Sequence, residues 1–152
     1  MRSPLLAVLA LGFLVACTAQ GSSIAATVEV KDAWIRTPPP GAPTAAGYAT
    51  IINHGIASDR LTGAYSSAAG SVGLHEMTKQ GGVMRMQPIA GGLPVGSSAS
   101  VKLSPDGRHL MLTGLKRPLK AGQHVRIVLQ FQRAGQIPTD FVVRDDAGGM
   151  RM

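Results

Sequence analysis

The sequence predicts an all-β protein, a β-sandwich that most simply has Greek-key connections. Its 152 residues include 19 glycines and 10 prolines but only 4% aromatic residues, and few segments beyond the N-terminus have a helical pattern. This composition favours many short strands joined by turns. The length predicts one domain with a sizeable core that needs no disulfide, and the single cysteine has no partner within the chain.

The first strands are indicated by alternation of apolar and polar residues. In segment 27–36, Val28 and Val30 share one face, with Trp34 as a candidate third member. The proline-rich stretch 37–43 cannot be a central strand, because proline donates no ladder hydrogen bond, and we interpret it as a rigid connection. The next two strands are predicted at 47–53 and 60–65.

The middle of the chain contains the strands with the most chemically useful side chains. Alternation places Val72, Leu74 and Glu76 on one face of segment 72–77, and His75 with Met77 on the other. A glycine turn then leads into segment 83–88, where Met84 and Met86 share a face. In segment 109–112, Leu110 and Leu112 are expected to face the core, with His109 and Met111 turned away together.

The remaining elements complete a sandwich of about eight short strands. Segment 89–100 is expected to be a long glycine-rich loop, and 104–107 a turn. Segment 124–131 has the clearest alternation in the chain, with Val125, Ile127, Leu129 and Phe131 inward. Short strands are also predicted at 101–103 and 141–144, and no second domain or repeat is indicated.

The N-terminus is typical of an export signal. Arg2 precedes twelve apolar residues, Leu5–Ala16, which are too few to span a bilayer as a helix. The segment ends in Leu14-Val15-Ala16-Cys17, similar to a bacterial lipobox, in which Cys17 would be lipidated; the alternative is cleavage near Ala25 or Ala26. We therefore expect a signal peptide at 1–17 with a lipobox-like end, a tether at 18–26, a domain at 27–144 and a flexible tail at 145–152, with the mature protein outside the inner membrane.

The formal net charge of +7 leaves several classes of partner to consider. A basic surface suits nucleic acid, anionic lipid or an acidic protein. The export signal argues against nucleic acid, and the basic residues are scattered and not interleaved with aromatics. The densest group, Lys116 to Lys120, could bind an acidic partner, although such a run is more often a solvated turn.

Two H-x-M elements, His75-Glu76-Met77 and His109-Leu110-Met111, are the strongest chemical signal. The two side chains of each element share a strand face, and the predicted hairpin brings Met86 close to the first element. Imidazole and thioether are soft, neutral donors that suit Cu(I) much better than Mg²⁺, Ca²⁺ or Mn²⁺. If these strands are neighbours, His75, Met86, His109 and Met111 could converge at one end of the sandwich.

Other interpretations of these residues have specific weaknesses. A single methionine usually fills a core and a single histidine is usually structural, but the repeated pattern is harder to explain in that way. An electron-transfer cupredoxin needs a cysteine thiolate, and Cys17 lies in the leader. Enzyme activity is not expected, because no nucleophile motif is present and Glu76 has no carboxylate partner at a useful spacing.

The chain resembles the PCu(A)C family of periplasmic copper chaperones. The family motif is a histidine, ten residues, a methionine, about twenty-one residues, then H-x-M. Here ten residues separate His75 from Met86 and twenty-two separate Met86 from His109. The extra residue is expected in the loop 89–100, where an insertion costs little. Other matching stretches are Val30–Arg36, Ala45–Tyr48, Asn53–Gly55, Gly82–Met86 and His109–Lys116.

The resemblance implies a cupredoxin-like fold and Cu(I) ligands at His75, Met86, His109 and Met111. Met77 and Met84 are spare thioethers, with two interpretations: accessory or transient ligands, or side chains that pack beside the site. The resemblance also implies a periplasmic, monomeric chaperone that delivers copper to the CuA centre during cytochrome c oxidase assembly, or to another acceptor, and touches a membrane only through a lipid anchor. Copper storage or resistance, or a β-sandwich interaction domain without metal, remain the alternatives. Some members also bind Cu(II) in a His- and Met-rich C-terminal extension; here the tail Gly148–Met152 has methionine but no histidine. His54 and His124 are expected to be structural or solvent-facing.

Overall fold

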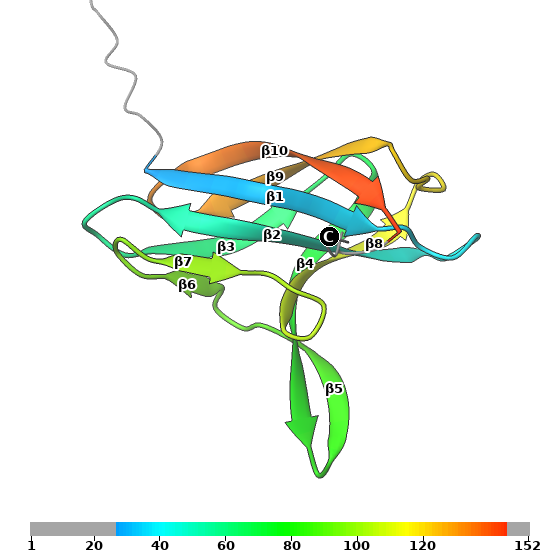
Figure 1. Cartoon of the computed structure of the whole chain (residues 1–152), viewed down its shortest axis with the longest axis horizontal. Helices are drawn as coiled ribbons and strands as arrows, with labels where there is room; N and C mark the ends of the chain where they lie inside the picture. The colour runs from blue at the N-terminus through cyan, green and yellow to red at the C-terminus, as the bar shows by residue number, and fades with distance from the viewer. Residues whose placement is uncertain (1–26, 146–152) are drawn as a thin grey trace, which may run out of the picture.

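The structure is a computed structural model that describes residues 27–145, all of them in strands, turns and loops (Figure 1). The predicted all-β, cupredoxin-like class is confirmed. The signal peptide, Cys17, the tether and all of the tail after Asp145 lie outside the described residues. The described strands are β1 (Val28–Arg36), β2 (Thr44–Asn53), β3 (Asp59–Tyr65), β4 (Ala69–Gln80), β5 (Val83–Pro88), β6 (Leu93–Val95), β7 (Ser100–Lys102), β8 (Arg108–Leu115), β9 (His124–Phe131) and β10 (Gly135–Arg144).

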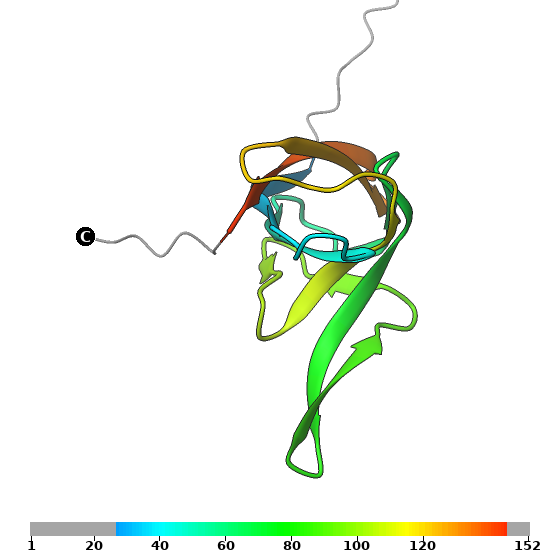
Figure 2. The ribbon, with the colours of Figure 1, turned by 90° about the vertical axis from the view of Figure 1, so that its right-hand side faces the viewer.

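Seven of the strands close into a barrel. The hydrogen-bonded order is β4-β8-β2-β1-β10-β9-β3, and the ring closes where Ala64 of β3 pairs with Val72 of β4. Figure 2 shows this ring of strands from its end. Strands β5, β6 and β7 lie outside the ring and pair with β4, β3 and β2. Among all strand pairings of residues 27–145, only that of β1 with β10 is parallel.

The barrel interior is filled by one side chain in two along each strand, as pleating requires. Leu110 and Leu112 of β8 are fully buried inside, as the sequence predicted. Complete burial of each large aliphatic side chain stabilises the fold by roughly 1.5–3 kcal/mol. Side chains of β8 that alternate with these leucines therefore lie on the outside of the barrel wall. The other fully buried large side chains are Phe141, Ile35, Ile51, Leu61, Leu93, Leu103, Ile127, Leu129, Val95 and Val143.

A β-bulge in β1 reverses the expected orientation of Trp34. The register with β2 shifts between Lys31 and Trp34, and Asp32 has φ of 51° within this irregularity. The extra residue changes the parity of the strand, so Ile35 faces the interior and Trp34 faces outward. The sequence-based grouping of Trp34 with Val28 and Val30 was therefore wrong.

The expected loop 89–100 contains a short strand. Leu93 and Val95 of β6 are buried against the core, while Pro94 is exposed and pairs with Arg60 at the sheet edge. A strand of three residues with a central proline gives no alternation long enough to detect, which explains why the sequence did not indicate it.

The β4–β5 hairpin projects from the barrel (Figures 1 and 2). Strand β4 pairs with β8 as far as Glu76 opposite Arg108, and beyond that point it continues with β5 as its partner strand. Gly81 and Gly82 form the turn with φ of 59° and 82°, the left-handed values that a two-residue type I′ hairpin requires. The hairpin carries its methionines away from the barrel wall.

Candidate metal centre

A row of rings crosses the outer face of the barrel wall from β1 to β4. His109 of β8 pairs directly with His75 of β4, and their rings are 6.0 Å apart, edge to face. On the side of His109 away from His75, the ring centroid of Tyr48 in β2 lies 6.4 Å from that of His109. The ring centroids of Trp34 and Tyr48 are 4.6 Å apart. The row places two imidazoles, contributed by strands far apart in the sequence, next to each other.

The His109 ring is held with one nitrogen free for a ligand. Only 4% of the residue is exposed. Its Nδ1 lies 3.3 Å from the Gly107 carbonyl oxygen, which can only accept a hydrogen bond, so this contact favours the neutral tautomer with the proton on Nδ1. Nε2 lies 3.3 Å from Sδ of Met86. In the tautomer that Gly107 favours, the nitrogen and the sulfur that face each other are both electron-pair donors.

The surroundings favour the neutral form of His109. Burial lowers the pKa of His109 below its usual value, the neighbouring His75 lowers it further, and the hydrogen bond to Gly107 opposes both effects only in part. A neutral imidazole is the form that binds metal ions. His109 therefore stays competent as a ligand to lower pH than a free histidine.

His75 lies beside His109 in a space left open by a glycine. Its Nδ1 is buried, and among the described residues it has no hydrogen-bond partner. Its Nε2 lies over Gly73, where a methyl group would be 3.3 Å away. An unsatisfied buried polar nitrogen costs about 1–3 kcal/mol. This nitrogen is the kind of group that a bound cation would satisfy.

The register places all four predicted methionines on the same outer face. Met111 of β8 pairs with Gly73, next to the histidine pair, and is partly buried. Met77 of β4 pairs with Met86 of β5. Met84 pairs with Lys79, one step further toward the hairpin tip, and is half exposed. His75, His109, Met86 and Met111 therefore lie at neighbouring register positions on the outer face of the barrel wall, near the end of the β4–β8 ladder.

The donor set fits a soft cation. Bonds of about 2.0 and 2.3 Å, the lengths that zinc forms with histidine nitrogen and cysteine sulfur, place the two donor atoms about 3.5 Å apart at a tetrahedral angle. The 3.3 Å between His109 Nε2 and Met86 Sδ is close to that separation. Within residues 27–145, no three His, Cys, Asp or Glu side chains group together. The donors on this face are imidazoles and thioethers, which together suit Cu(I).

Three residues that shape this face were not assigned a role from the sequence. Tyr48 packs against His109, Gly107 orients its ring, and Gly73 leaves room for His75. Gly73 could have been found, because residues two apart on a strand share a face. The contacts of Tyr48 and Gly107 depend on which strands are neighbours, and the sequence pattern does not reveal that.

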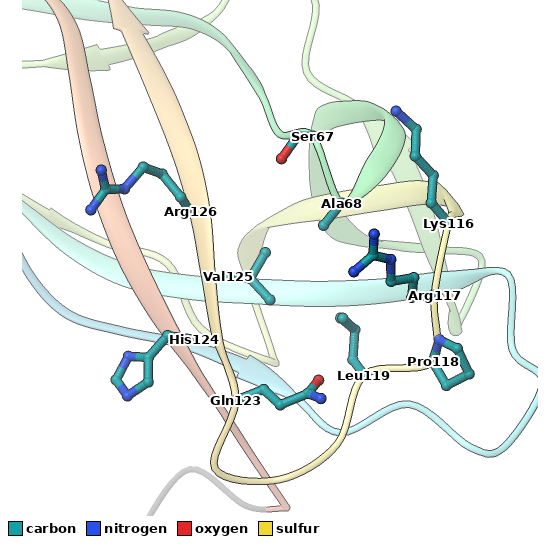
Figure 3. Close-up of a pocket in the computed structure, with 10 residues that line it drawn as sticks. All are labelled: Ser67, Ala68, Lys116, Arg117, Pro118, Leu119, Gln123, His124, Val125 and Arg126. Atoms are coloured by element: carbon teal, nitrogen blue, oxygen red, sulfur yellow. The ribbon is translucent and has the colours of Figure 1, made fainter.

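The basic run Lys116–Lys120 belongs to a different part of the molecule. Its first four residues, 116–119, line a groove of about 580 Å³ between the β8–β9 connection and the residues just before β4. Figure 3 shows Lys116 and Arg117 on one side of the groove and Arg126 on the other. The pair Ala69–Leu115 at this end is six residues along β4 from the His75–His109 pair, roughly 20 Å away. The groove therefore does not contribute to the His/Met face.

The other two histidines lie elsewhere. His54 is exposed, and its Nε2 lies 2.8 Å from Oε2 of Glu29. His124 is exposed at the start of β9 and lines the basic groove. In the described part of the chain, no helix is long and apolar enough to cross a membrane.

Solved structures with a similar fold include PCuAC domains. The apo PCuAC domain from PmoF1 superimposes with a TM-score of 0.67 at 24% identity, over 79% of this chain and 95% of that one. The Cu(I) form of DR1885 from Deinococcus radiodurans has a TM-score of 0.61 at 29% identity, over 86% and 87% of the two chains. The fold is thus that of the PCuAC class.

Sequence comparison assigns the family. The model described as "Putative lipoprotein LpqE-like" matches residues 28–143. The putative lipoprotein Lxx21020 of Leifsonia xyli subsp. xyli (strain CTCB07) is 35% identical over 121 residues, 80% of this chain and 72% of that protein. The chain belongs to the LpqE-like lipoprotein family.

Proposed function

We propose that this protein binds Cu(I) through His75, Met86, His109 and Met111 and passes the ion to a copper acceptor. One observation carries the proposal: Nε2 of His109 and the thioether sulfur of Met86 face each other at 3.3 Å. In the tautomer that Gly107 favours, both atoms carry a lone pair toward the same space, and a shared cation would bind both. Because all four donors are neutral, a bound cuprous ion adds a net charge of only +1 to a half-buried site.

Two similar proteins support copper as the ion. The PCuAC domain of PmoF2 is described as copper-bound, and DR1885 is described with Cu(I). Thioether ligands need no deprotonation, and they avoid the oxidation to which a thiolate site is exposed outside the cytoplasm.

Several features fit delivery and not catalysis. The site combines buried His109 with half-exposed Met86, so one side of the ion would be accessible to a partner. We infer that the protein is exported, lipid-anchored through Cys17 and acts in the periplasm, which the lipoprotein description of its family supports. The proposed acceptor is the CuA centre of cytochrome c oxidase.

Competition titration tests the binding site. A chromophoric Cu(I) chelator of known affinity is titrated with the wild type, with Met86→Leu, and with Val83→Leu as a control on the same strand. Met86 is 48% exposed, so the leucine variant should fold normally. Loss of one of four ligands is expected to weaken Cu(I) binding at least 10–100-fold, the range seen for changes just outside a metal site. X-ray absorption should find two sulfur and two nitrogen neighbours in the wild type and one sulfur fewer in Met86→Leu.

Two results would refute the assignment. One is Cu(I) binding too weak to compete with the chelator in the wild type. The other is equal Cu(I) affinity of the wild type and Met86→Leu. Transfer to an isolated CuA-containing oxidase domain, followed by the absorption of that centre, separates delivery from storage: a storage protein would retain its copper.

A further inference from the structure

The β4–β5 hairpin displays an unusual amount of apolar surface at its tip. Val83, Met84 and Met86 are 57%, 51% and 48% exposed, although all three belong to one short strand. These three side chains are not part of the barrel core, because among the described strands β5 pairs only with β4. Two of the three are thioethers on the same face as the histidine pair.

The thioethers form a sequence of steps toward the histidines. Met84, opposite Lys79, is the outermost; the Met77–Met86 pair follows; the His75–His109 pair comes next. Alternate residues on a strand are about 6.6 Å apart. Each methionine has three rotatable bonds, so the sulfurs of Met84 and Met86 can approach the separation at which both bind one ion.

We propose that Met84 is an outer contact for Cu(I), which receives the ion from a donor and hands it to the inner ligands, and acts in reverse on release. This inference rests on the proposed function of the inner site. The chain offers Met84 no other structural role: its side chain is half exposed at a hairpin tip where nothing in the described residues packs on it as a core.

The transfer is a ligand exchange without electron transfer. The Met84 thioether would form one Cu–S bond as one bond from the ion to the donor breaks. The Met86 thioether and then His109 Nε2 would form further bonds as the remaining bonds to the donor, and finally the bond to Met84, break. Copper remains Cu(I) throughout, no proton moves, and the donor leaves with every lone pair it contributed.

Such an outer contact should affect rates and not the final equilibrium. An ion held on Met84 is present near Met86 at an effective concentration in the millimolar range, far above that of free donor complex. Replacing Met84 by leucine, which has similar volume, should therefore slow transfer about tenfold or more in both directions. The equilibrium between protein and donor should shift less than twofold.

Stopped-flow transfer from bicinchoninate–Cu(I) to the full-length mature protein tests this. The variants are Met84→Leu, the control Val83→Leu, and the double variant Met84→Leu/Val83→Met, which moves the thioether to the opposite face of the same strand. We expect slow transfer for Met84→Leu, wild-type rates for Val83→Leu, and no rescue in the double variant.

The outcomes separate this inference from the inner site. Wild-type transfer rates in Met84→Leu would overturn it while leaving Cu(I) binding intact. Fast transfer restored in the double variant would also overturn it, because the transfer rate would then not depend on a thioether on the same strand face as the inner ligands. A large loss of equilibrium affinity in Met84→Leu would overturn it as well, by making Met84 a resident ligand. Failure of the proposed function itself would appear as absent binding in the wild type.

Discussion

Substitution of Gly73 should separate fold stability from metal affinity, with opposite signs. A methyl group at this position would lie 3.3 Å from Nε2 and 3.6 Å from Cδ2 of His75. The first distance is shorter than ordinary van der Waals contact, so the imidazole must shift by a few tenths of an ångström. Gly73 does not have a positive φ, so alanine fits the backbone.

The two effects have different sizes. Alanine in place of a strand glycine stabilises by about 0.4–1 kcal/mol, chiefly by restricting the unfolded chain. Displacing a ligand by acting on its neighbour typically costs 10–100-fold in metal affinity, or about 1.4–2.8 kcal/mol. We therefore expect Gly73→Ala to unfold at slightly higher urea concentration than the wild type and to bind Cu(I) at least tenfold more weakly.

Urea denaturation of the apo protein and chelator competition measure the two quantities. Gly70→Ala is the matched control on the same strand: its methyl group would meet only backbone atoms, the nearest being the Thr113 carbonyl oxygen at 3.4 Å. Cu(I) affinity unchanged in Gly73→Ala would show that the position of the His75 ring does not matter to binding, and the reasoning would fail.

Three further outcomes are expected. Burial raises the pKa of Asp59, but three backbone N–H donors outweigh this effect and hold the pKa below its usual value. The Asp59 carboxylate therefore stabilises the fold at pH values above its pKa in the unfolded chain. This stabilisation is lost as the pH falls through the lower pKa of the folded protein. Asp59→Asn should therefore lower the free energy of unfolding by roughly 2 kcal/mol at neutral pH, and by less near pH 3, in urea titrations. Tyr48→Leu removes the ring between Trp34 and His109, which should cost about 1–2 kcal/mol and move the emission of the chain's one tryptophan to the red. His54→Ala should leave the chelator competition curve unchanged, and a weaker curve would place His54 among the ligands.

The sequence predicted those parts of the fold that depend on local alternation. The faces of β8 and β4, including His109 with Met111 and His75 with Met77, follow from strand parity alone. The direct pairing of His75 with His109 depends on β4 and β8 being neighbours, which local pattern does not determine. The resemblance in motif spacing implied that both histidines belong to one ligand set, and the structure adds that the two residues are direct partners in the sheet.

The errors arose where one residue changed a strand's parity or where a strand was very short. The bulge at Asp32 moved Trp34 to the outer face, and β6 has only three residues. The groups that orient the histidines were also missed, because Gly107 acts through its backbone carbonyl and Gly73 through the absence of a side chain. Neither property is visible in residue type alone.

The strand pairing divides the His/Met face between a fixed part and a movable part. His75 and His109 belong to the closed barrel, whereas Met86 belongs to β5, which within residues 27–145 has β4 as its only hydrogen-bonded neighbour. Separation of β5 from β4 breaks local bonds and leaves the ring of seven strands intact, so it requires far less free energy than global unfolding. In the proposed site, Met86 could therefore move away from a bound ion while the two imidazoles stay in place.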